Sequence, residues 1–147
     1  MIVRWTAPDD GGSVITAYTI MIRQNDGGFS PVLTTCNGAS ATIVQNLQCS
    51  ISETVLIAAP FNIPWNSEVF ATVAAVNIYG TSGPSTVGGG AIIVTVPNPP
   101  LNLQNNSSLT TSTQIGFTWS EPSFDGGKPV ISYRINIDRG TGVYELL

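Results

Sequence analysis

The sequence predicts an all-β chain that folds as an antiparallel β-sandwich. Strand-length runs of β-branched residues are separated by turn residues about every ten positions, a spacing typical of sandwiches. The composition agrees, because 15 Gly and 10 Pro interrupt a chain that is 42% hydrophobic and only 10% charged. No segment keeps a helical period for more than about one turn.

Five runs are expected as strands. In chain order they are Ile20 to Ile22, Val32 and Leu33, Ile43 and Val44, Val69 to Val76, and Ile92 to Val96. The segments between them carry residues that favour turns, namely Asp26-Gly27-Gly28, Asn37-Gly38, Gly80 to Pro84 and Gly88-Gly89-Gly90. Glu53 to Ala59 fits one helical turn, which Pro60 and Pro64 end.

An internal repeat divides the chain. The segment from Trp5 to Tyr18 returns as Trp119 to Tyr133, with Trp, Pro, Asp-Gly-Gly, Val-Ile and Tyr in the same order. One inserted residue in the turn explains why the offset is 114 at the Trp and 115 at the Tyr. Such self-similarity marks two copies of one module. We therefore expect a module over residues 1–97 that lacks its first strand, and the first strands of a second, truncated module over 98–147.

These residues resemble the fibronectin type III family, whose fold is an immunoglobulin-like seven-stranded sandwich. Family positions are matched by Trp5 and Trp119 on the second strand, Tyr18 and Tyr133 on the third, Leu56, the Val73-Ala74-Ala75-Val76-Asn77-Ile78-Tyr79-Gly80 segment, and Asn98-Pro99-Pro100. The resemblance implies that Trp5, Tyr18, Val73 and Ala75 face inward.

Two departures distinguish the chain from ordinary members of that family. Val69 stands where the family has an aromatic residue, and Phe70 is expected on the opposite face of the strand. The segment from Cys36 to Cys49 is an insert. A tandem array with a disulfide insert is similar to large repetitive surface or secreted proteins of unicellular eukaryotes.

Cys36 and Cys49 are the only cysteines. They are too few for a zinc site without histidine and wrongly spaced for a CxxC pair, so a disulfide is favoured over free buried thiols or a redox-active pair. Asn105 and Asn106 begin two overlapping N-x-Ser sequons and predict an N-glycan at one of them. Together these features favour an extracellular location, secreted or at the cell surface.

Several classes of chemistry have little support. The chain has no His, and Lys128 is its one lysine, so acid–base and nucleophilic catalysis lack a base and no enzyme or cofactor is expected. A net charge of −4 without a basic patch argues against nucleic-acid binding, and no apolar run is long enough to insert into a membrane. Asp9, Asp10 and Asp125 could ligate calcium, but capping of Gly-rich turns is favoured and no metal is expected.

The leading hypothesis is a non-catalytic spacer in a long extracellular array, forming a surface stalk or filament with neighbouring copies of the same module as partners. Val96 to Pro100 supports it as a semi-rigid Pro-rich linker. The alternative is a ligand-binding adhesion or receptor ectodomain, with Phe61, Trp65 and Tyr79 as a candidate contact patch. An accessory module beside a carbohydrate-active domain is a third possibility.

Overall fold

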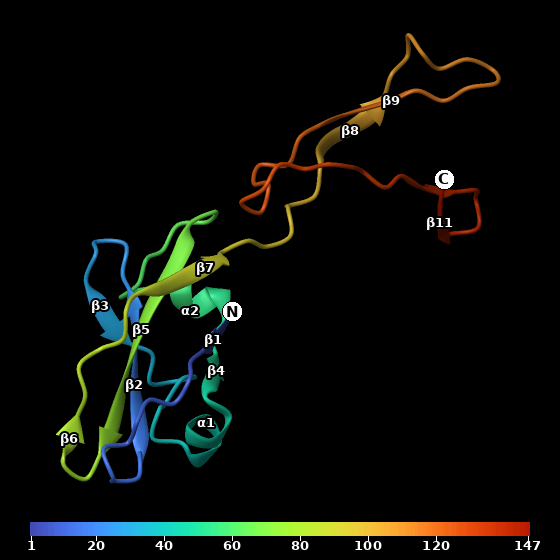
Figure 1. Ribbon diagram of the computed structural model, residues 1–147. Coiled ribbons are helices and arrows are strands. Elements are labelled where there is room, and N and C mark those ends of the chain that lie inside the picture. Colours follow the sequence, from blue (N-terminus) through green and yellow to red (C-terminus); the bar gives the residue numbers. More distant parts are fainter. The chain divides into compact units, whose positions relative to one another are not determined.

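The computed structural model describes residues 1–147 and consists mostly of strands in antiparallel sheets, with two short helices (Figure 1). The chain divides into two compact units, Met1–Val94 and Thr95–Leu147, hereafter unit 1 and unit 2. None of its helices has the length and apolarity needed to cross a membrane.

Unit 1 contains two antiparallel sheets. The larger has the order β3 (Phe29–Pro31), β2 (Ala17–Arg23), β5 (Glu68–Asn77), with β6 (Gly80–Thr81) and β7 (Gly88–Ile92) both pairing with β5. The smaller joins β1 (Ile2–Arg4) to β4 (Gln48–Ser50), with Val3 opposite Cys49.

The hydrophobic core of unit 1 includes residues from both sheets. On β2 alternate side chains are buried, with Tyr18, Ile20 and Ile22 exposing 5%, 2% and 0% of their surface. This period of two is the pattern of a strand with one face on a core. Leu56 is also buried, and partly buried Trp5, Val73 and Ala75 pack against the cluster. The inward positions expected for Trp5, Tyr18, Val73 and Ala75 are confirmed.

The helices are α1 (Ala41–Asn46) and α2 (Glu53–Ile57). The helical turn expected near Glu53 is confirmed, but the strand expected at Ile43 and Val44 is wrong, because both lie in α1. The chain must return from Cys36 to Cys49 over 13 positions to a Cα–Cα distance of 5.3 Å. A helix advances about 1.5 Å per residue against about 3.3 Å for a strand, so a helix fits this short return.

Three further boundaries differ from the expectation. Val32 and Leu33 follow β3 instead of forming it, and Gly88 to Gly90, expected as a turn, form the first part of β7. Of the run from Ile92 to Val96, expected as a strand, only Ile92 belongs to β7. The pairing of β5 with β7 changes register between Val69 and Ala71. A Cβ on Gly89 would lie 2.8 Å from the Phe70 ring, so glycine allows the strand to pass that ring.

The two faces of β5 at Val69 and Phe70 are as expected. Val69 is 3% exposed in the core, whereas Phe70 is half-buried on the other face, where the Arg23 guanidinium lies 5.2 Å from its ring centroid. This distance suits a cation–π contact.

Unit 2 contains two strand pairs, β8 (Leu101–Asn105) with β9 (Phe117–Ser120) and β10 (Asn136–Asp138) with β11 (Tyr144–Leu146). The predicted module boundary follows residue 97. Residues 95 to 98 are held to unit 2, because the Thr95 and Asn98 backbone N–H groups donate to Gly126 O at 2.9 Å and Phe124 O at 3.0 Å.

Candidate functional site

A disulfide joins Cys36 to Cys49 and encloses α1. Both cysteines are buried, at 2% and 5% exposure. The enclosed segment lies against β2, since the Tyr18 N–H donates to Gly38 O at 3.0 Å. A Cβ at Gly38 would overlap the Tyr18 carbonyl oxygen, so this close approach requires glycine. The disulfide therefore ties the start of the inserted segment to β4 of the smaller sheet, while the Gly38 contact holds the same segment against β2 of the larger sheet.

The repeated Trp and Tyr form the same contact in both units. The rings of Trp5 and Tyr18 lie 5.2 Å apart at an interplanar angle of 60°, and those of Trp119 and Tyr133 lie 5.3 Å apart at 61°. Aromatic pairs favour such tilted contacts over parallel sandwiches. The sequence repeat is thus also a repeat of side-chain packing.

The repeated Asp-Gly-Gly turns also share their geometry. Asp10 Oδ1 accepts the Gly12 N–H and Asp125 Oδ1 accepts the Gly127 N–H, both at 2.8 Å. The glycines have positive φ in each copy, 65° and 82° in the first and 81° and 85° in the second. Asp9 makes the same contact to the Gly11 N–H. The predicted role of Asp9, Asp10 and Asp125 as turn caps is confirmed.

A hairpin extends the repeat beyond the similarity found in the sequence. In unit 1, β2 pairs with β3 through Met21↔Pro31, Ile22↔Ser30 and Arg23↔Phe29. In unit 2, β10 pairs with β11 through Asn136↔Leu146, Ile137↔Glu145 and Asp138↔Tyr144. Every number in the second set exceeds its counterpart by 115, the offset between Tyr18 and Tyr133.

The hairpin repeat was missed because few of its residues are identical. A signal was nevertheless present, since a glycine precedes an aromatic residue by two positions in Gly27-Gly28-Phe29 and Gly142-Val143-Tyr144. Gly27 and Gly142 both have positive φ, at 92° and 78°. The turn requires this conformation, which glycine adopts without strain.

The candidate contact patch of Phe61, Trp65 and Tyr79 is not a single exposed surface. Phe61 is buried in the core at 3% exposure, and Trp65 is partly buried against that core. Tyr79 is 85% exposed in the turn between β5 and β6. Phe61 and Tyr79 flank opposite ends of β5, so the patch is wrong as a set and only Tyr79 retains an exposed role.

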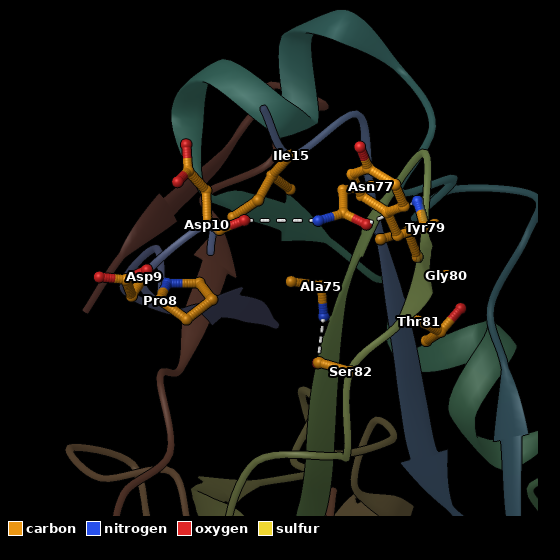
Figure 2. A pocket seen from close by; sticks show the side chains of 11 residues that line it. Pro8, Asp9, Asp10, Ile15, Ala75, Asn77, Tyr79, Gly80, Thr81 and Ser82 are labelled. Atoms are coloured by element: carbon orange, nitrogen blue, oxygen red, sulfur yellow. Dashed lines mark hydrogen bonds between the residues drawn. The ribbon is translucent and has the colours of Figure 1, made fainter. Parts of the chain in front are cut away.

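A pocket of about 330 Å³ lies beside Tyr79 (Figure 2). The Asn77 side-chain amide donates to Asp10 O at 3.4 Å, and its Oδ1 accepts the Tyr79 N–H at 2.9 Å. The Ala75 N–H donates to Ser82 Oγ at 3.0 Å. The pocket thus has a hydrogen-bonded rim and one large exposed aromatic side chain.

The two sequon asparagines lie where β8 ends. Asn105 is exposed, and Asn106 is half-buried and opens the following loop. Asn106 Oδ1 accepts the Ser108 N–H at 3.2 Å and the Ser108 hydroxyl at 2.9 Å. The glycan at one of them stays a prediction.

No group of three or more His, Cys, Asp or Glu side chains is arranged to hold a metal ion. Lys128, Glu121 and Asp125 are exposed around the second Asp-Gly-Gly turn.

Comparison with known proteins gives one informative similarity. The chain is 29% identical over 140 residues to a protein named titin homolog from Caenorhabditis elegans, and the match covers 90% of this chain. It spans only 1% of that much longer protein. No protein-family profile matches the chain. The similarity fits an all-β protein of structural, repeat type.

Proposed function

We propose that the chain is a non-catalytic structural segment of a long extracellular array of tandem fibronectin type III modules, where it acts as a spacer in a surface stalk or filament. The carrying observation is the constant offset of 115 between the β2–β3 and β10–β11 registers. Together with the matched Trp–Tyr pairs, it supports two copies of one module in this chain.

The connection to unit 2 supports a spacer role. Pro97, Pro99 and Pro100 restrict the backbone before β8. The Thr95 and Asn98 N–H groups are bonded to the turn at Phe124 to Gly126, and the Asn98 side chain donates to Ser123 Oγ at 3.2 Å. These bonds hold the Pro-rich segment against unit 2, and a segment with restricted backbone suits a spacer.

The disulfide and the similarity to titin homolog add independent support. Disulfides persist mainly in oxidising compartments, which favours the extracellular assignment. The similarity extends over nine tenths of the chain to a protein about a hundred times longer, which suits a segment of a repetitive array.

Electron microscopy of the native parent protein tests the proposal. We expect rods or filaments with an axial repeat of about 35 to 40 Å, from strands of up to about ten residues plus a linker. Compact particles without an axial repeat would overturn the structural role. Intact mass with and without deglycosylation tests the extracellular assignment in the same material.

A second candidate, a ligand-binding adhesion or receptor module, rests on the pocket in Figure 2 and on Tyr79. Exposed Tyr residues are enriched among binding hot spots. Tyr79→Ala should abolish cell or matrix adhesion of the native array without changing its unfolding. Unchanged adhesion would remove this candidate.

A further inference from the structure

Ile93 is held in unit 1 just after β7 ends. Its N–H donates to Ser67 O at 3.0 Å, and its carbonyl oxygen accepts the Asn66 N–H at 2.8 Å. The Ile93 side chain is buried in the core of unit 1. Because a peptide group is planar, the Ile93 carbonyl and the Val94 N–H lie in one plane. The bonded carbonyl therefore fixes that whole peptide group in unit 1.

Unit 2 opens with an entry segment, residues 95–98, that is bonded to a turn later in the same unit. The Thr95 N–H donates to Gly126 O at 2.9 Å, and the Asn98 N–H donates to Phe124 O at 3.0 Å. The Asn98 side-chain amide donates to Ser123 Oγ at 3.2 Å. The turn that carries these three acceptors is hereafter the clasp, because it holds the entry segment at both of its ends.

Gly126 is needed both for the clasp and for the shape of its own turn. A Cβ at Gly126 would overlap the Thr95 carbonyl oxygen and would lie 3.0 Å from the Val96 carbonyl carbon. The φ of Gly126, 81°, also favours glycine. Gly142, between β10 and β11, has a similar φ of 78°, but a Cβ there would meet nothing within 4 Å. The two glycines therefore share the backbone requirement and differ in the close approach to the entry segment.

Val94 is the single residue between the two held peptide groups. The Thr95 N–H lies in one plane with the Val94 carbonyl, so its bond to Gly126 fixes that peptide group in unit 2. Only φ and ψ of Val94 then separate a peptide group held in unit 1 from a peptide group held in unit 2. The Val94 side chain is 45% exposed. Hinges are often formed by a few residues at the end of an element, which absorb changes in φ and ψ.

We propose that Val94 is the joint between unit 1 and unit 2, and that the entry segment moves with unit 2 as part of its fold. Bending of the chain is confined to the two backbone dihedrals of Val94, whose branched Cβ favours extended values. The Pro-rich run follows the joint and is not the flexible element. The joint rests on bonds within each unit, and only its recurrence along a stalk rests on the proposed function.

Nitrogen-15 NMR relaxation of chain 1–147 tests the position of the joint, because it gives a correlation time and an order parameter for each backbone amide. We expect the Val94 amide to tumble with unit 1, and the amides of Thr95, Val96 and Asn98 to tumble with unit 2. Order parameters in the entry segment should be about 0.85, the value of rigid backbone, and values below about 0.6 would overturn the joint. A single correlation time for all amides, or a change that falls after Asn98, would overturn it as well.

Two alanine variants test the clasp. Gly126→Ala and Gly142→Ala both place a side chain at positive φ, but only Gly126→Ala overlaps the entry segment. We expect the order parameter of the Thr95 amide to fall below about 0.6 in Gly126→Ala and to stay unchanged in Gly142→Ala. Equal order parameters in the two variants would overturn the clasp.

The ring contact between Trp119 and Tyr133, followed by nuclear Overhauser effects, reports whether unit 2 stays folded in Gly126→Ala. If that contact is lost, Asn98→Ala replaces this variant, since it removes the bond to Ser123 Oγ without changing the turn. We then expect a lower order parameter at position 98, and an unchanged value would overturn the clasp.

Two glycine variants test whether the motion is confined to Val94. Glycine has wider backbone freedom than valine, so Val94→Gly should widen the joint and shorten the correlation times of both units. Val96→Gly makes the same change inside the entry segment, where the bonds to the clasp should keep the correlation times at their wild-type values. Equal shortening in both variants, or none in Val94→Gly, would overturn the assignment to Val94. None of these measurements depends on an array or on an extracellular location, so the joint and the proposed function can fail separately.

Discussion

Reduction of the Cys36–Cys49 disulfide should lower the free energy of unfolding of unit 1 by about 3 kcal/mol. The cysteines are 13 positions apart. On the chain-entropy account, opening a loop of about 14 residues returns about 10 cal/mol/K to the unfolded chain, which is about 3 kcal/mol at 25 °C. Both cysteines are buried in the core, and reduction leaves both sulfur atoms in place. The comparison therefore isolates the cross-link from any cavity.

Urea unfolding followed by tryptophan fluorescence measures this difference. In a Trp119→Phe background the remaining indoles, Trp5 and Trp65, both pack against the unit 1 core and report on that unit alone. The same loss should lower the melting temperature by about 12 to 24 °C, given about 4 to 8 °C per kcal/mol for a domain of this size.

A double variant, Cys36→Ala with Cys49→Ala, is the control for the reductant, whose addition should not change its unfolding. A difference below about 1 kcal/mol between the oxidised and reduced chains would refute the reasoning. It would mean that α1 and Gly38 stay close to β2 in the unfolded ensemble as well. The cross-link would then remove little conformational entropy from the unfolded chain.

Three further predictions concern single positions. Gly38→Ala should destabilise unit 1 by about 1 to 3 kcal/mol, because its Cβ would overlap the Tyr18 carbonyl. Gly83→Ala, whose Cβ meets open space, is the control. Equal unfolding midpoints of the two variants would contradict the close approach of Gly38 to Tyr18. Ile22→Ala removes a fully buried side chain and should cost about 2 to 5 kcal/mol in urea unfolding, whereas Ile78→Ala, at 78% exposure, should change stability by less than about 0.5 kcal/mol. When the chain is secreted from a glycosylating host, its intact mass should show one N-glycan, since adjacent asparagines leave no room for two. Ser107→Ala removes only the Asn105 sequon and Ser108→Ala removes only the Asn106 sequon, so one of the two variants should lose the glycan. An unmodified wild-type chain would contradict the assignment.

The sequence determined the features that depend on local chemistry. The alternation of Tyr18, Ile20 and Ile22 follows from a strand with one buried face, and the Asp-Gly-Gly turns follow from side-chain capping and the freedom of glycine at positive φ. The Trp–Tyr repeat was visible for the same reason, since the same residues recur in the same order around the Asp-Gly-Gly turn, with one inserted residue in the second copy. These elements required no knowledge of distant parts of the chain.

Tertiary structure decided the elements whose conformation depends on distant contacts. Ile43 and Val44 have strand propensity, yet the disulfide and the core make a helix the shorter return path. The run of three glycines from Gly88 to Gly90 predicts a turn, but pairing with β5 beside the Phe70 ring makes this segment a strand. Propensity was overridden in both places because long-range packing and pairing contribute more than the small intrinsic preferences of single residues.

The exposure of the candidate contact residues was likewise decided by the tertiary structure. The sequence singled out Phe61, Trp65 and Tyr79 as aromatic residues near turns, but whether an aromatic side chain is buried depends on which strand ends meet. In the folded unit, Phe61 is buried in the core, Trp65 is partly buried against it, and Tyr79 is exposed.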